Sequence, residues 1–316
     1  MPEAPPPAET GDHRRLGRLI SRIENEPGAA AAIVAELWSR TGRARRIGLT
    51  GSPGVGKSTL ANQLITAARE AGLTVAVIAV DPSSPFSGGA ILGDRVRMLR
   101  HSGDPGVYVR SMAARAQLGG LAAATRDVAY VLEAFGFDAV LVETVGVGQS
   151  ELDIMGLADT VVVVAAPGLG DAVQTLKAGI LEIADVLVVN KADRPGAKET
   201  AMQLREMGRL VPHHGAWDIP VLETAAGTGA GVPELWDAIR RHGEYLIASG
   251  ELETRRARRA EREVLQLVEA ALAARVRATL EGRGASAEAL ERAKRHETDP
   301  HTAAKAILDR IVPPAP

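Results

Sequence analysis

Short apolar runs recur along residues 46–224, and they constrain the fold more than any other feature of the chain. Strands covered by helices on both faces are continuously apolar, whereas half-exposed strands alternate with polar residues. Segments with helical spacing separate most of these runs. The sequence therefore predicts an α/β fold with a doubly wound, mostly parallel sheet. The seven runs are RIGLT (46–50), LTVAVIAV (73–80), VYVR (107–110), FDAVLVE (137–143), TVVVVAA (160–166), DVLVVN (185–190) and IPVLET (219–224).

Helical segments flank this region on both sides. We divide the chain into a disordered, Pro/Ala-rich tail (1–11), an N-terminal helical segment (12–44), the domain that holds the sheet (45–249) and a C-terminal helical extension (250–316). The extension is too thin to hold its own core, so its apolar stripe must pack on the main domain or on a second subunit. The stripe consists of Leu265, Val268, Leu272, Val276 and Leu280.

Composition excludes several classes of function. The chain of 316 residues has no cysteine, which rules out disulfides and thiolate metal sites. Its formal net charge of −2 gives no bulk attraction to nucleic acid or to an anionic membrane. No apolar run approaches the roughly 20 residues of a membrane span, and the first 12 residues contain no apolar signal region. We therefore expect a cytoplasmic protein without nucleic-acid or membrane partners.

The stretch GSPGVGKST follows the first apolar run and opens a helical segment. It matches the phosphate-binding pattern G-x-x-x-x-G-K-[ST] in the context that the pattern requires. Backbone N–H groups of such a turn point at phosphate oxygens, the lysine reaches the β- and γ-phosphates, and the serine hydroxyl binds Mg²⁺. The predicted nucleotide contacts are Gly51, Ser52, Pro53, Gly54, Val55, Gly56, Lys57, Ser58 and Thr59.

The tetrapeptide NKAD ends the run 185–190 and predicts which base is bound. The Asp193 carboxylate can accept hydrogen bonds from N1–H and the exocyclic amine of guanine, a pair that adenine does not offer. Asn190 can bond the other edge of the ring, and the alkyl stem of Lys191 can cover the base. Four residues are a weak signal alone, but after a phosphate-binding motif they favour GTP over ATP.

Two further stretches predict groups around the cation and the γ-phosphate. Glu143 ends the run 137–143, where an acid orients Mg²⁺, and Gly146 can donate its N–H to the γ-phosphate. Gln149 is a candidate for positioning the attacking water. In DPSSPFSGGAILGD (81–94), an acid stands at each end of a pliable run.

We interpret residues 81–97 as a switch segment. Asp81 and Asp94 are expected at Mg²⁺, with Arg97 available for phosphate charge. The alternative is that Asp81 starts a turn and Asp94 caps a helix. The loop 167–179 lies at the same predicted edge, and it is either a reporter of the nucleotide state or an ordinary solvated loop.

Two other features are discounted. His213 and His214 lack further metal ligands at suitable spacing, so we expect them in a surface loop. A run of basic residues is flanked by glutamates, so we expect it on a solvated helix face with salt bridges. The run consists of Arg255, Arg256, Arg258 and Arg259.

In combination these motifs resemble the MeaB/ArgK family of P-loop GTPases. The segments that carry the resemblance are GLTGSPGVGKSTL, AVDPSSPFSGGAILGDRVRM, VETVGVGQSE, APGLGDAVQTLKAGILEIADVLVVNKAD and GVPELW. The resemblance implies a SIMIBI-like G domain that binds GTP/GDP and Mg²⁺, with Ser58, Asp81, Asp94 and Glu143 around the cation. Catalysis would involve Lys57, Asp94, Arg97, Glu143 and Gln149. One departure is Ala225-Ala226, where Ser-Ala commonly supports the guanine. We still expect both alanines at the nucleotide, because the backbone N–H of Ala226 could serve in place of the serine.

The resemblance also implies a function and a partner. It suggests a G-protein chaperone that gates adenosylcobalamin loading and protects an adenosylcobalamin-dependent acyl-CoA mutase, and a homodimer joined through the C-terminal helices. Two alternatives stay open. One is a nucleotide-dependent protein kinase linked to amino-acid transport, and the other is a metal-insertion GTPase, which the absence of cysteine disfavours.

Overall fold

The computed structural model describes residues 10–26, 28–82, 99–101, 103–114, 120–144, 154–168, 180–210, 216–282 and 284–311. Within them the chain forms two compact units, residues 1–256 and 257–316. No helix of these described ranges is long and apolar enough to cross a membrane.

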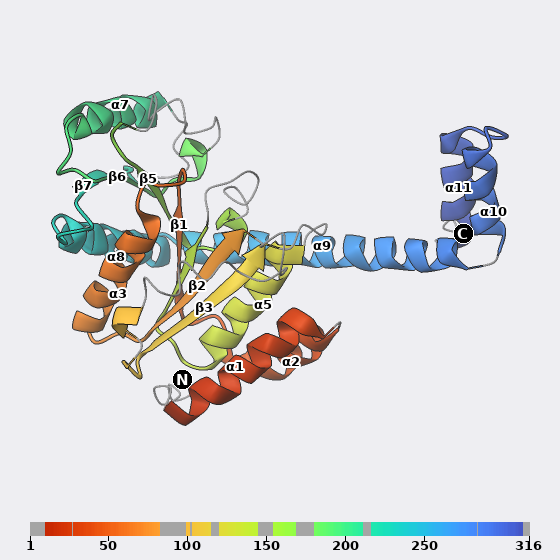
Figure 1. Cartoon of the computed structure of the whole chain (residues 1–316), viewed down its shortest axis with the longest axis horizontal. Helices are drawn as coiled ribbons and strands as arrows, with labels where there is room; N and C mark the ends of the chain where they lie inside the picture. Colours follow the sequence, from red (N-terminus) through yellow and green to blue (C-terminus); the bar gives the residue numbers. More distant parts are fainter. Residues whose placement is uncertain are drawn as a thin grey trace. The chain divides into compact units, whose positions relative to one another are not determined.

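The first unit is built on a seven-stranded sheet in which every described strand pair is parallel (Figure 1). The strand order β3-β2-β4-β1-β5-β6-β7 places β1 in the middle, with later strands added on both sides. This confirms the predicted doubly wound sheet. The strands are β1 (Arg45–Thr50), β2 (Val75–Pro82), β3 (Val107–Ala114), β4 (Ala139–Glu143), β5 (Thr160–Ala165), β6 (Val186–Asn190) and β7 (Val221–Thr224).

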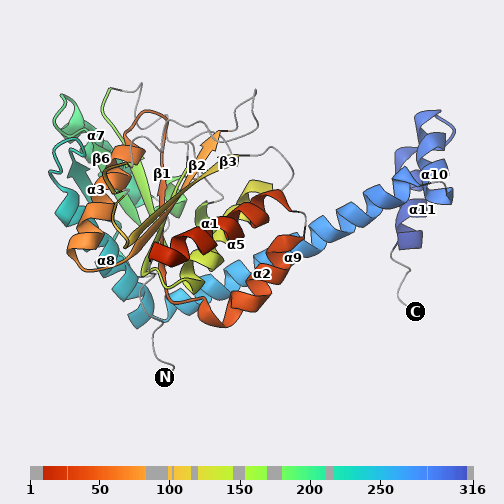
Figure 2. The same ribbon diagram turned by 60° about the horizontal axis from the view of Figure 1, so that its bottom comes forward.

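Helices cover both faces, which is why the strands are apolar throughout. Helices α3 (Lys57–Glu70) and α8 (Val232–Ala248) pack on one face, against residues such as Leu49, Val77 and Val188. Alternate strand residues point to the opposite face. There β2 and β4 meet α1 (Thr10–Asn25), α2 (Ala29–Leu37) and α5 (Gly120–Ala134), while β5 and β6 meet α7 (Ala197–Leu210) (Figure 2).

Short 3₁₀ segments complete the described part of this unit. They are η1 (Trp38–Arg40), η2 (Leu99–His101), η3 (Ile154–Gly156) and η4 (Leu181–Ile183). Residues 169–179, which come shortly before η4, lie outside the described ranges.

The C-terminal extension is helical, as predicted. Helix α9 (Glu251–Glu281) runs from the first unit into the second, and α10 (Ala285–Lys294) and α11 (Pro300–Ile311) follow it. Helices α10 and α11 pack on each other, with Ser286, Ala303 and Ile307 buried. By contrast, α9 exposes Val264, Leu265, Leu267, Val268 and Leu272.

Parallel strands bring all their carboxyl ends to one edge of the sheet. Ligands of open α/β sheets bind outside this edge. Thr50, Asp81, Glu143 and Asn190 all stand at or next to a strand's carboxyl end. The predicted site residues of four strands are therefore collected at one edge by the topology alone.

Candidate functional site

The phosphate-binding turn lies between the carboxyl end of β1 and the start of α3. Gly51 and Gly56 both have positive φ, of 139° and 95°. A Cβ on Gly51 would lie 2.1 Å from the carbonyl oxygen of Val164, and one on Gly56 would lie 2.5 Å from Nδ2 of Asn190. Glycine is required at both positions by backbone conformation and by close approach. The turn so formed directs the amino end of α3 toward the edge of the sheet, as an anion site needs.

Lys57 lies across this turn. Its Nζ donates to the carbonyl oxygens of Gly51, at 2.6 Å, and Ser52, at 3.0 Å, and the residue is buried. The ammonium charge is thus held beside the turn whose N–H groups would cradle phosphates. A triphosphate offers the same ammonium stronger, charged acceptors.

Ser58 and Glu143 meet at the base of the turn. The Ser58 Oγ donates to Oε1 of Glu143 at 2.6 Å, and both residues are buried. Glu143 is level with Leu49 of β1 and Ala79 of β2, so Asp81 stands two positions farther along the neighbouring strand. A hydroxyl and a carboxylate are the hard oxygen ligands that Mg²⁺ prefers.

The donor set fits a magnesium ion that is bound mainly through phosphates and water. Among the residues described, no three His, Cys, Asp or Glu side chains form a group that could hold a metal by themselves. Mg²⁺ in nucleotide sites takes one or two protein ligands and completes its shell with water and phosphate oxygens. Ser58 and Glu143 would supply those two ligands.

Asn190 joins the phosphate-binding turn to the loop after β7. Its Nδ2 donates to the Val55 carbonyl at 2.9 Å, and its Oδ1 accepts from the Thr224 hydroxyl and the Ala226 N–H at 3.2 and 3.0 Å. Lys191 has a positive φ of 61° and donates from Nζ to the Gly54 carbonyl at 2.6 Å. The NKAD segment is therefore fixed against the turn, as expected of a base-binding segment.

Asp193 completes the NKAD segment, and Ala225 and Ala226 lie in the loop after β7. Asp193 is exposed, so its carboxylate is accessible to a ligand. Ala225 and Ala226 are buried, and their N–H groups donate to the Ala230 carbonyl and to Asn190. The alanines lie beside the predicted guanine residues, but here their amides order the loop and orient Asn190.

Several predicted site residues lie outside the described ranges. These are Asp94 and Arg97, Gly146 and Gln149, and most of the loop 167–179, and the discounted His213 and His214 lie outside the ranges as well. The backbone of Asp81 is in β2, and its side chain is among the parts not described. The roles given to these residues stay predictions.

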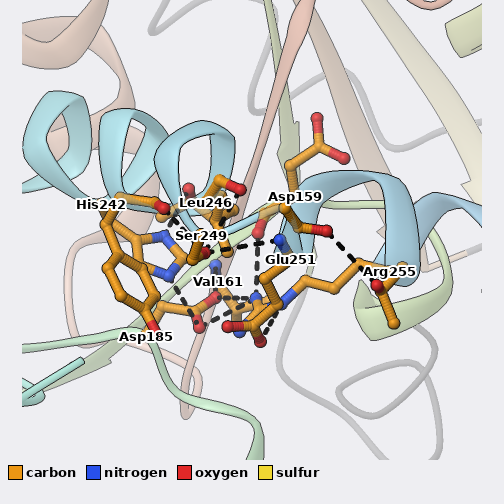
Figure 3. Close-up of polar contacts among 12 residues, drawn as sticks. Asp159, Val161, Asp185, His242, Leu246, Ser249, Glu251 and Arg255 are labelled. Carbon is orange, nitrogen blue, oxygen red and sulfur yellow. Dashed lines mark hydrogen bonds and ion pairs between the residues drawn. The ribbon is translucent and has the colours of Figure 1, made fainter. Parts of the chain in front are cut away.

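A second polar cluster, which sequence reasoning missed, lies at the opposite edge of the sheet (Figure 3). Asp185 precedes β6, accepts the Val161 N–H at 2.8 Å and pairs with Arg255 through Nη1 at 2.9 and 3.1 Å. His242 lies between Asp185, 3.2 Å from its Nε2, and the Thr160 hydroxyl, 2.8 Å from its Nδ1. His242, Thr160 and Asp185 are all buried, so this group stabilises the fold and is not a nucleophile site.

The cluster continues through Arg256 and Arg46. Arg256 donates to the carbonyls of Gly42 and Ala44 and pairs with Asp159 at 2.9 Å. Arg46 is buried, pairs with Glu133 and lies 4.5 Å from the centre of the Tyr130 ring. Burial opposes the charge of Arg46, but the attraction and hydrogen bond of Glu133 outweigh it and raise the pKa above its ordinary value.

These contacts correct one expectation. Arg255 and Arg256 were predicted on a solvated helix face, yet their side chains are only 29% and 28% exposed. Burial opposes both charges, and the pairing with Asp185 and Asp159 nevertheless raises both pKa values. The prediction was wrong because the flanking glutamates are not the main partners of these arginines, with Glu251 only a secondary one.

Comparison with known proteins decides the family. The family described as methylmalonyl Co-A mutase-associated GTPase MeaB matches residues 16–281. The chain belongs to the MeaB family of GTPases. The match spans the phosphate-binding turn, Glu143 and the NKAD segment, and it confirms the resemblance seen in the sequence. The chain is therefore a GTPase that binds guanine nucleotides.

Individual relatives agree with this assignment. A putative GTPase of Pyrococcus abyssi is 49% identical over 313 residues, covering 96% of this chain and 94% of the relative. The mouse protein named methylmalonic aciduria type A homolog, mitochondrial, is 38% identical over 215 residues, covering 67% of this chain and 52% of the mouse protein. The crystal structure titled LAO/AO transport system kinase superposes with a TM-score of 0.70 at 25% identity, covering 95% and 94% of the two chains.

Proposed function

We propose that this MeaB-family GTPase is a magnesium-dependent chaperone of an adenosylcobalamin-dependent acyl-CoA mutase of the methylmalonyl-CoA type. The observation that carries the proposal is that Ser58, Glu143 and Asn190 lie at the phosphate-binding turn, in a chain that matches a mutase-associated family over residues 16–281. In this proposal nucleotide exchange and hydrolysis gate cofactor loading and protect the mutase from inactivation.

The site residues divide the work on the nucleotide. Lys57 and the N–H groups of the turn hold the phosphates, Ser58 and Glu143 hold Mg²⁺, and Asn190, Lys191 and Asp193 hold the guanine. When bound, Mg²⁺ neutralises charge on the β- and γ-phosphate oxygens. Asp81, Asp94, Arg97, Gly146 and Gln149 keep their predicted roles at the cation, the γ-phosphate and the attacking water.

The mutase role is tested by association that depends on the nucleotide. The protein is mixed with purified methylmalonyl-CoA and isobutyryl-CoA mutases in GDP, in a non-hydrolysable GTP analogue and without nucleotide, and the complex is measured by size exclusion. We expect one mutase to bind, with an affinity that differs between the two nucleotides, and to change the rate of GTP hydrolysis. Lys57→Ala should remove the difference between nucleotides. Equal association in all three conditions, or none, would reject the proposal.

The solved relative named LAO/AO transport system kinase raises a kinase activity as a second candidate. The fate of the γ-phosphate separates the two activities. GTP labelled on that phosphate should release inorganic phosphate and leave every protein unlabelled. Label on a protein or on an amino acid would favour the kinase.

We also propose that the second unit joins two copies of the chain. Helix α9 exposes Val264, Leu265, Val268 and Leu272, which recur at helical spacing on one stripe. Contiguous exposed apolar surface marks an interaction site. Val268→Glu combined with Leu272→Glu should convert a dimer to a monomer in light scattering, while Glu263→Gln combined with Glu269→Gln should leave the dimer intact. A wild-type monomer would contradict this assignment. The expectation of a cytoplasmic location stays a prediction.

A further inference from the structure

Gln63 is a residue of α3 that none of the motifs includes. Its Nε2 donates to the carbonyl oxygen of Ala226 at 2.9 Å, across 163 positions of sequence. A backbone carbonyl can only accept, so the amide group must present its NH₂ to Ala226. The side chain also lies against Gly229, where a Cβ would come within 3.7 Å of its Oε1.

This contact completes a ring of hydrogen-bonded segments around the proposed guanine site. Gln63 holds the Ala226 carbonyl, the Ala226 N–H is held by Oδ1 of Asn190, and Nδ2 of Asn190 donates to the Val55 carbonyl. Val55 lies two residues before α3, the helix that carries Gln63. The ring therefore links the phosphate-binding turn, the NKAD segment and the loop after β7 through side chains from α3 and β6.

The N–H and the carbonyl of Ala226 are both bonded by side chains from other elements, Asn190 of β6 and Gln63 of α3. In the loop itself, the amides of Ala225, Thr228 and Gly229 bond within residues 225–230. These local bonds shape the turn but do not fix it against α3. The Gln63 amide supplies a side-chain tie from the loop to α3. Ala225 supplies no hydroxyl, so the loop has no side chain of its own at that position that could replace the tie.

We infer that Gln63 is a positioning residue for guanine recognition: by holding Ala226 it fixes the orientation of the Asn190 amide against the base. The inference rests on the proposed guanine site. Gln63 lies on α3, outside the phosphate-binding turn, and its amide bonds the loop after β7, so its effect should be confined to the base.

The test compares three ligands on the full chain, by competition with a fluorescent GDP. The ligands are GDP, inosine diphosphate, which lacks only the exocyclic amine, and inorganic pyrophosphate, which has no base. Gln63→Ala should weaken GDP and inosine diphosphate equally, by roughly fivefold, and leave pyrophosphate unchanged. Gln63→Glu, which turns a carboxylate oxygen toward the Ala226 carbonyl, should weaken both by about tenfold or more.

Controls separate this inference from the site on which it rests. Thr66→Ala removes a bond inside α3, from the Thr66 hydroxyl to the Asn62 carbonyl, and should change none of the affinities. Asp193→Asn should weaken GDP more than inosine diphosphate. Suppose that Asp193→Asn weakens GDP more than inosine diphosphate. If Gln63→Ala then changes none of the affinities, or weakens pyrophosphate as much as GDP, the role of Gln63 is refuted and the guanine site stands. If Asp193→Asn also has no effect, the guanine site itself fails.

Discussion

The two edges of the sheet carry buried charged groups that are satisfied in different ways. At the amino edge, Asp185 is paired with Arg255 (Figure 3), and Asp159 is paired with Arg256. At the carboxyl edge, the Lys57 ammonium is held by two neutral carbonyls. These carbonyls belong to the phosphate-binding turn, so the ammonium stands where the phosphates of a nucleotide are proposed to bind.

This difference separates stability from function. The amino edge carries complementary charges within the protein, and substitutions there should lower the free energy of unfolding without changing the chemistry. The carboxyl edge carries the groups that we propose bind the nucleotide, and substitutions there should lower binding or turnover without unfolding the chain. The predictions below test this separation in order of expected effect.

Lys57→Ala should have the largest effect. Loss of a charge aimed at the transferred phosphate should lower the rate of GTP hydrolysis by a factor of about 10²–10³, as for other groups that stabilise transition-state charge. The melting temperature without nucleotide should change little. Phosphate release and thermal unfolding are measured on the same samples, with Thr66→Ala as the control in α3. A normal rate would show that the turn does not bind the reacting phosphates.

Asp185→Ala should have the reverse effect at the other edge. It removes the acceptor of Arg255 and of the Val161 N–H and the carboxylate that lies 3.2 Å from His242 Nε2, and breaking a buried pair on one side costs about 3 kcal/mol. The melting temperature should fall by roughly 10 °C, while hydrolysis per folded molecule at low temperature should be retained. Asp237→Ala, which removes only exposed ion pairs on α8, is the control and should leave the melting temperature unchanged. Loss of hydrolysis without loss of stability would defeat the separation.

Asp193→Asn should have an intermediate effect, confined to base recognition. The variant cannot accept from both N–H groups of guanine, so GDP affinity should fall by roughly tenfold, or about 1.4 kcal/mol, in calorimetry. Glu199→Gln removes a nearby exposed charge at the start of α7 and should leave the affinity unchanged. Unaltered GDP binding in Asp193→Asn would put the guanine contact elsewhere.

Thr160→Val should have the smallest effect. The substitution keeps the side-chain shape and removes the hydroxyl that bonds His242 at 2.8 Å. The expected loss is about 1 kcal/mol of unfolding free energy, measured by urea denaturation, with GDP affinity unchanged. A reduced GDP affinity would mean that the two edges are coupled.

The parts that could be predicted from the sequence depend on neighbouring residues. The apolar runs predicted the strands, and the spacing of Gly51, Gly56, Lys57 and Ser58 predicted the turn, because both patterns are local. The topology then brought Glu143 and Asn190 to the same edge, as parallel strands require.

The parts that could not be predicted depend on side chains that are distant in sequence. Arg255 pairs with Asp185 across 70 positions and Arg256 with Asp159 across 97 positions, whereas nearby glutamates suggested local pairing. Gln63 gives no signal, because one glutamine on a helix looks like any exposed polar residue. Only the packing of α3 beside the loop after β7 shows its contact with Ala226.

Amide hydrogen exchange with and without GDP and Mg²⁺ tests the central claim most directly, because it reports on both edges in one experiment. We expect ligand to slow exchange at residues 51–58, 190–193 and 225–231 and to leave residues 159–161, 185–186 and 251–256 unchanged. Slowed exchange at the amino edge with no change at residues 51–58 would contradict the assignment of the carboxyl edge as the nucleotide site.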